Sequence, residues 1–267
     1  MPAVQLSRLA QQIDVLVWQF TRPADFLIHL RDLFELYANR LQKSGQAVPP
    51  TSMAPSFRTP TIIMRQLEVE LRQPCEQQPA AAFALVEALW GETILEYRIL
   101  ATIILGMIPL QPPESVLQRI RTYAAPKIDT HVIEALLNNG GRRIRRETPD
   151  LWIDLIEDWA NASSLGLQAI ALKAIMITTM DEKFANFPPL FRIFSAVLQT
   201  GPSALQAELQ TTLMALLKYS PKETVYLLRQ VLSLTSSATT RRLVRLSLSH
   251  VPPEYQNSLR QALQSLQ

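Results

Sequence analysis

The sequence has few of the residues on which metal sites and disulfide scaffolds depend. Its 267 residues include one cysteine, Cys75, and three histidines. A single cysteine excludes an internal disulfide framework and a zinc site built on cysteines, and three histidines do not favour a metal cluster. We therefore expect neither a metal nor any other cofactor.

Glycine is also scarce, with 7 residues against 19 prolines. Sheet proteins use glycine for tight turns and bulges, so a glycine-poor chain argues against an all-β fold. Hydrophobic residues make up 48% of the chain and charged residues 18%, which is enough apolar material for a large core. The composition indicates helices that are interrupted by prolines.

No hydrophobic run is long enough to span a membrane. The most apolar run, residues 99–110, has the length of a buried core helix, and polar residues interrupt the N-terminal twenty. The net charge of +3 and the isoelectric point near 9.1 permit a polyanionic partner without requiring one. We expect a soluble, cytoplasmic monomer.

Prolines open apolar-periodic segments at regular intervals over most of the chain. Their separations are 34, 36, 40, 32 and 32 residues, and they stand at Pro79, Pro113, Pro149, Pro189, Pro221 and Pro253. Proline suits the first turn of a helix, where its missing N–H leaves no hydrogen bond unmade. Each interval has room for a second helix, and Thr93 with Glu96 has the spacing of a capping box at one such start.

Helix pairs that recur every 32 to 40 residues predict an all-α, HEAT-like α-solenoid. A tetratricopeptide array is the alternative, but it requires a strict period of 34 and a Trp/Leu-Gly/Tyr pattern that is absent. We expect residues 1–47 to form a leading helix pair, 48–60 a proline-rich loop, and 61–267 the repeats of one continuous domain.

Two groups of arginines are candidates for binding DNA phosphates, since arginine forks match phosphate geometry. The first group lies between two predicted helices, with Ile144 as its inward anchor: Arg142, Arg143, Arg145 and Arg146. The second begins the second helix of a later pair: Arg241, Arg242 and Arg245. A charged run is also typical of a solvated turn, and acidic residues follow the first group closely.

Glu134 is a lone carboxylate on an otherwise apolar predicted helix, with His131 three positions earlier. It could act as a general base or an electrostatic stabiliser, or it could simply face solvent. Glycine-rich phosphate loops, nucleophile elbows and metal-spaced His/Glu sets are absent from the sequence. Kinase, dinucleotide-dependent and ordinary hydrolase functions are therefore unsupported.

The stretch LWGETILEYRILA (residues 89–101), continued by Leu105-Gly106, resembles the signature of the DNA alkylation repair (AlkD-like) family. The preceding run SFRTPTIIMRQLEVELR, from Ser56, is similar to the family's segment before that signature. The resemblance implies a HEAT-like fold that cradles duplex DNA. It also implies removal of cationic N3- and N7-alkylated purines, for which a carboxylate stabilises the developing oxocarbenium ion.

In that family, as the resemblance implies, a Trp and an Asp four residues apart share one helix, and an Arg lies on the equivalent helix of the next repeat. Alignment places Thr130, Glu134 and Gln168 at these positions. The sequence contains no Trp between Trp90 and Trp152 and no Arg between Arg146 and Arg192, so the substitutions do not depend on the alignment register.

Three functions follow from this comparison. The first is an AlkD-like protein that binds duplex DNA through a basic groove and has lost glycosylase chemistry. The second is a protein–protein interaction scaffold. The third is an active alkylpurine DNA glycosylase that uses Glu134, alone or with His131.

Overall fold

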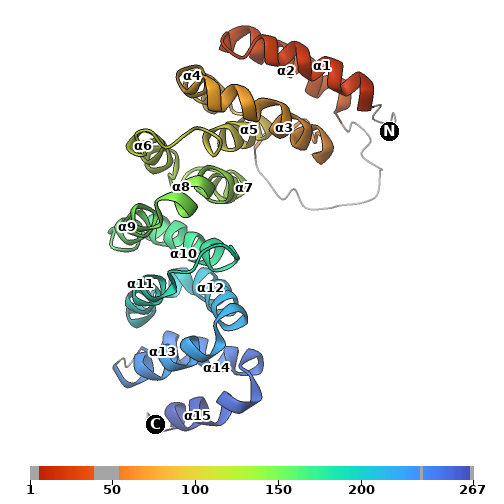
Figure 1. The fold of residues 1–267 in the computed structure, drawn as a ribbon. Helices are drawn as coiled ribbons and strands as arrows, with labels where there is room; N and C mark the ends of the chain where they lie inside the picture. Colours follow the sequence, from red (N-terminus) through yellow and green to blue (C-terminus); the bar gives the residue numbers. More distant parts are fainter. Residues whose placement is uncertain (1–5, 39–53, 235–236, 265–267) are drawn as a thin grey trace, which may run out of the picture. The chain divides into compact units, whose positions relative to one another are not determined.

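The structure is a computed structural model that describes residues 6–38, 54–234 and 237–264. Within these ranges the chain is helical and forms no β-strand, which confirms the prediction of an all-α fold (Figure 1). Contacts between residues divide the chain into two compact units. Unit 1 comprises Met1–Tyr123 with Lys127–Arg143, and unit 2 comprises Ala124–Pro126 with Ile144–Gln267. The predicted loop at 48–60 lies partly outside the described residues, and the predicted division into helix pair, loop and repeats stays a prediction.

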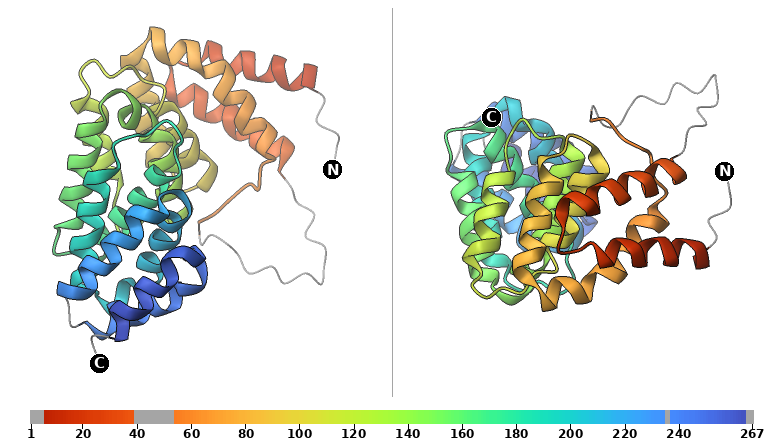
Figure 2. Two further views of the ribbon diagram at one scale, coloured as in Figure 1. Left: turned by 60° about the horizontal axis from the view of Figure 1, so that its bottom comes forward. Right: turned by 90° about the horizontal axis from the view of Figure 1, so that it is seen from above.

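Unit 1 is built from two rows of helices. The helices are α1 (Leu6–Trp18), α2 (Pro23–Tyr37), α3 (Thr61–Gln77), α4 (Pro79–Gly91), α5 (Leu95–Leu105), α6 (Glu114–Tyr123) and α7 (Thr130–Ala135). Contacts run along α1, α3, α5 and α7 in one row, and α2 contacts α4 in the other. Figure 2 shows α1 and α2, in red, as a helix pair. Side chains of α6 continue the second row, because Arg119 and Tyr123 both bind Glu87 of α4.

Unit 2 repeats this arrangement. Its helices are α9 (Pro149–Ala160), α10 (Leu165–Thr179), α11 (Phe187–Thr200), α12 (Gln206–Tyr219), α13 (Pro221–Leu234), α14 (Ala238–Ser247) and α15 (Pro253–Gln264). Contacts connect α9, α11, α13 and α15 in one row and α10, α12 and α14 in the other (Figure 1). Two rows of stacked helices are the arrangement of a HEAT-like solenoid. The boundary between the units falls inside the short helix α8 (Arg142–Glu147).

The prolines mark helix starts as the sequence predicts. Helices α4, α9, α13 and α15 each have proline as their first residue. Helix α6 starts directly after Pro113, and α11 has Pro188 and Pro189 in its first turn. The missing N–H of proline belongs to the first turn, whose N–H groups have no partner within the helix.

The predicted capping box at Thr93 and Glu96 is wrong. Helix α5 begins at Leu95 without a side-chain cap, and Glu96 is buried. Its carboxylate instead accepts hydrogen bonds from three donors of the loop before α3: Ser56 Oγ at 2.7 Å, Phe57 N at 3.1 Å and Thr59 N at 3.3 Å. A buried carboxylate requires such donors, and this one holds the loop against α5.

Gly106, which ends α5, allows two stretches of backbone in unit 1 to come together. A Cβ atom at this position would collide with the backbone carbonyl of Asn139, in the turn after α7. Colliding backbone atoms cannot move aside as the end of a side chain can. The absence of a side chain at Gly106 therefore determines how closely α5 and the turn after α7 can pack.

A buried polar cluster joins α8, α9 and α10 in unit 2. The Arg145 guanidinium, whose side chain is 4% exposed, lies 3.0 Å from a carboxylate oxygen of Asp181 and 5.6 Å from the Trp152 ring centroid. Trp152 Nε1 donates to Thr178 Oγ1 at 2.8 Å. Burial alone would raise the pKa of Asp181, but bonds from Arg145 and the Lys183 N–H and the charge of Arg146 leave this pKa below its ordinary value.

We expect Gly106→Ala to lower the free energy of unfolding by about 1–3 kcal/mol, because the added methyl group forces α5 away from the turn that follows α7. Gly91→Ala is a matched control, since a Cβ atom at Gly91 would meet no atom within 4 Å. Urea denaturation measures both variants. Equal stabilities of the two would contradict the close packing at Gly106.

We expect Asp181→Asn to destabilise the protein by about 3 kcal/mol at pH 7, because it removes the carboxylate charge that lies 3.0 Å from the buried Arg145 guanidinium. The folded pKa of Asp181 is lowered, so its stabilisation is complete above the unfolded pKa near 4 and is lost as pH falls through the folded value. The difference between variant and wild type should therefore shrink below about pH 4. Urea denaturation midpoints at pH 7 and pH 3 measure this stability difference, and the variant Asp154→Asn, at an exposed position, is the control. A stability difference that does not change with pH would contradict the prediction.

Candidate nucleic-acid interface

Helix α7 carries Thr130 and Glu134, which the sequence alignment predicts to stand at the family's catalytic positions in unit 1. The Asp129 side chain accepts the backbone N–H of His131 at 2.8 Å and caps the helix. Val132 and Ile133 are buried, while Thr130 is exposed and Glu134 is half-buried. Residues four apart share a helix face, so Thr130 and Glu134 stand together at the surface of α7. The face offers a hydroxyl and a carboxylate but no aromatic ring.

The helix continues beyond its predicted end at Leu137, through a π-helical turn at Leu136–Gly140. The turn is closed by a hydrogen bond of 2.9 Å from Gly141 N to Leu136 O. Asn139 Nδ2 lies 3.4 Å from Thr102 Oγ1 of α5. Wide turns of this kind often occur at functional sites. Here the turn also anchors α7 to α5.

The first arginine group forms a helix, α8, and not the connection between helices that the sequence predicts. Ile144 is fully buried, so its predicted role as inward anchor is confirmed. Each arginine of the group has a partner inside its own unit. Arg142 pairs with Glu68 at 3.1 Å, and Arg143 donates to Met107 O at 2.8 Å. Arg145 and Arg146 both pair with Asp181.

These contacts give the first group a structural role in each unit. Of the Arg142, Arg145 and Arg146 side chains, only that of Arg146 has more than a third of its surface exposed. A carboxylate partner neutralises the charge of an arginine and occupies some of its N–H donors, so a phosphate binds it less strongly. The assignment of Arg142, Arg143, Arg145 and Arg146 to DNA binding stays a prediction, and these contacts weaken it.

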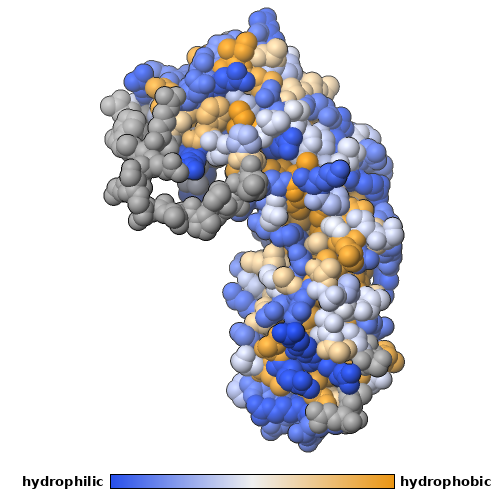
Figure 3. Space-filling model, turned by 180° about the vertical axis from the view of Figure 1, so that it is seen from behind, coloured by the Kyte–Doolittle hydropathy of each residue, from blue (hydrophilic) through white to orange (hydrophobic). Residues whose placement is uncertain are grey.

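The second group lies on α14, where the predicted residues fall within the helix and not at its first positions. Arg242 and Arg245 are exposed and Arg241 is half-buried. The helix contains no acidic residue and is anchored by buried Thr240, whose hydroxyl donates to Leu198 O at 2.7 Å. Figure 3 shows strongly hydrophilic residues gathered over the C-terminal helices, in the lower part of the view. Two exposed cations on one rigid helix are suited to phosphate contacts.

Gln168, which the sequence alignment predicts to stand at the family's cation position, lies in the first turn of α10 in unit 2. Its Nε2 donates to the backbone carbonyl of Ala162 at 2.9 Å. The neutral amide therefore ties the α9–α10 connection to the helix. It carries no charge that could pair with a phosphate.

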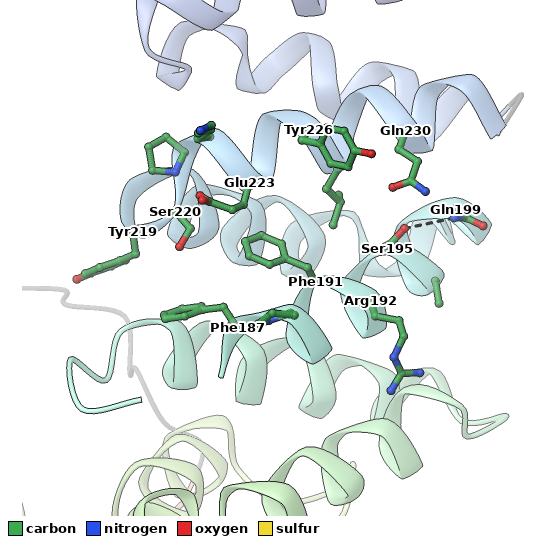
Figure 4. A pocket seen from close by; sticks show the side chains of 15 residues that line it. Phe187, Phe191, Arg192, Ser195, Gln199, Tyr219, Ser220, Glu223, Tyr226 and Gln230 are labelled. Carbon is green, nitrogen blue, oxygen red and sulfur yellow. Dashed lines mark hydrogen bonds between the residues drawn. The ribbon is translucent and has the colours of Figure 1, made fainter. Parts of the chain in front are cut away.

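Unit 2 contains a groove between α11 and α13 that the sequence does not predict (Figure 4). The groove has a volume of about 1200 Å³, and its aromatic lining residues are Phe187, Phe191, Tyr219 and Tyr226. Phe187 and Phe191 follow the spacing of a core stripe, so periodicity alone assigns them to the interior. Tyr226 gave a signal in the sequence, because it lies beside the apolar stripe formed by Val225, Leu228 and Leu232 and not within it.

Two further features of the described residues concern cofactors and membranes. Side chains of His, Cys, Asp and Glu nowhere gather in a group of three or more that could hold a metal ion. None of the described helices is both long and apolar enough to cross a membrane. The tryptophans predicted to pack do so: Trp152 and Trp159 are buried, and Trp90 stacks on Tyr123 with ring centroids 4.0 Å apart.

The resemblance of residues 89–101 to a known signature now has a structural basis. Glu96 holds the loop before α3, and Trp90 packs α4 against α6. Gly106 allows α5 and the turn after α7 to pack closely. No curated protein and no solved structure gives a significant match to the chain. The model of the family described as "DNA alkylation repair enzyme" matches residues 57–224, which is more than half of the sequence. The chain belongs to the DNA alkylation repair enzyme family.

Proposed function

We propose that this protein binds duplex DNA through the basic helix α14 and has lost the base-excision chemistry of its family. The exposed arginine pair on α14 carries the proposal. Arg242 and Arg245 are both exposed, and no acid lies on the helix to neutralise them. The family membership supports a function related to DNA repair. Helix α14, and not α8, is then the main phosphate contact.

Physical reasons favour α14 over α8. Phosphate binding releases counterions from DNA and is strongest for cations that need not leave a partner. On α8, Arg145 is buried against Asp181 and is part of the core of unit 2. On α14, the arginines extend from a helix whose other face holds buried Leu243 and Val244. A rigid helix with cations on its outer face needs little rearrangement to meet a DNA backbone.

The loss of catalysis follows from the residues at the family's active-site positions. A cationic alkylpurine needs a surface to stack on and a carboxylate beside the sugar. Glu134 keeps the carboxylate, but Thr130 offers no ring. Gln168 replaces the cation and bonds to Ala162 O. One carboxylate without its partners is insufficient to hold an extruded base in place.

We expect the double charge reversal Arg242→Glu with Arg245→Glu to weaken duplex binding by about tenfold or more, and to lower the slope of log affinity against log salt by about two. Fluorescence anisotropy of a labelled duplex at several salt concentrations measures both. Arg8→Glu with Arg22→Glu is the matched control, since these exposed arginines lie in unit 1 and the charge changes equally. Salt-independent binding, or equal losses in both double variants, would overturn the proposal.

We expect no release of N3- or N7-methylpurines from methylated duplex DNA above the spontaneous rate. Chromatography of the released bases measures this, with an active alkylpurine glycosylase as positive control. Release that disappears in Glu134→Gln would show instead that the protein is an active glycosylase. The His131→Ala variant would then tell whether Glu134 acts alone.

A further inference from the structure

The two helices that line the groove of unit 2 each present side chains to it at every fourth position. On α11, residues at every fourth position face it: Phe187, Phe191, Ser195 and Gln199. On α13 a second row has the same spacing: Lys222, Tyr226 and Gln230. Residues four apart lie about 6 Å apart along a helix. Figure 4 shows aromatic rings along one stretch of the groove, and the amides Gln199 and Gln230 at the other end.

Two of the four aromatic side chains that line this groove are exposed, and the two phenylalanines are half-buried. Tyr226 is 70% exposed and Tyr219 is 42% exposed. Tyr226 and Gln230 also line a second hollow of about 600 Å³, which continues to Ser258 and Gln261 of α15. Tyr226 therefore stands on the ridge between two hollows. A ring in this position can accept a planar partner on either side.

The charge around the groove is positive. Lys222 lines the groove, Arg229 lines the adjoining hollow, and Lys218 Nζ lies 5.2 Å from the Tyr219 ring centroid. Glu223 is the carboxylate of the lining. Arg192 is neutralised by a bidentate pair with Glu157 at 2.6 and 2.7 Å.

We propose that this groove binds single-stranded DNA, with unpaired bases stacked on Tyr226 and its neighbouring rings. Accessible aromatic rings beside lysine and arginine are the combination that holds single strands without regard to sequence, because every base has a π-face. The amides of Gln199 and Gln230 can meet base edges, and Lys222 and Arg229 meet phosphates. The charge favours this occupant over an uncharged protein segment.

The single-strand site is independent of the duplex contact proposed for α14. Helices α11 and α13 belong to one row of unit 2, and α14 belongs to the other. The two proposals therefore concern different residues and different forms of DNA, so that a variant in one site can test it while the other remains intact.

The test compares a labelled oligothymidine of about twelve residues with an abasic oligonucleotide of the same length and charge. We expect the thymidine strand to bind more tightly. Tyr226→Leu should weaken thymidine binding by about five- to one-hundredfold, which corresponds to the loss of one or more stacked bases. Tyr226→Phe, which keeps the ring, should bind nearly as wild type. Glu223→Gln should bind more tightly, because it removes a negative charge beside the phosphates.

Two controls complete the experiment. Trp18→Leu changes an aromatic residue that is 84% exposed in unit 1, and it should leave binding unchanged. The α14 double variant should keep its thymidine binding within about threefold, even where it loses duplex DNA. Equal affinity for both oligonucleotides, or a Tyr226→Leu variant that binds as wild type, would overturn the proposal. Absence of binding to either strand would also overturn it, and would leave a protein segment as the occupant of the groove.

Discussion

Within each unit, the structure depends on the apolar face that every helix pair leaves uncovered. Two helices alone cannot bury such residues as Leu172, Leu198 and Leu213, and burial is complete only where the next pair packs against them. The hydroxyls of Thr212 and Thr240 extend this dependence, because they donate to Leu172 O and Leu198 O across successive helices. Removing one pair would thus expose both of its neighbours.

The same requirement explains where charge has become part of the fold. A buried charge is tolerated only with partners close by. Glu96 meets this condition through donors of the loop before α3, and Arg145 meets it through Asp181. Both residues look like candidate functional charges in the sequence, but in the structure they stabilise the packing of helices and loops. Glu96 lies in the stretch 89–101 that resembles the family signature, so this part of the resemblance reflects packing within the fold.

The proposed functions lie where this requirement is relaxed. Arg242 and Arg245 on α14 and Tyr226 on α13 are exposed, and each sits on a helix whose opposite face is well buried. A rigid helix can present cations or rings at a constant spacing with little loss of entropy on binding. The two proposals therefore assign the duplex contacts to one row of helices in unit 2 and the single-strand groove to the other.

The sequence by itself determined the all-α class, the helix starts at the prolines, the buried tryptophans and the inward position of Ile144. These follow from local rules: proline's missing N–H and the 3.6-residue period act within one or two turns. Tertiary structure decided which arginines are buried and which are exposed. Arg145 and Arg242 look alike in sequence, but Asp181 lies 36 residues from Arg145 and meets it only after α8, α9 and α10 have packed. Tertiary structure also decided that Glu96 binds a loop 37 to 40 residues away, and that α11 and α13 enclose a groove. Such contacts depend on which helices pack against each other, and the hydrophobic periodicity of a single helix does not predict its neighbours.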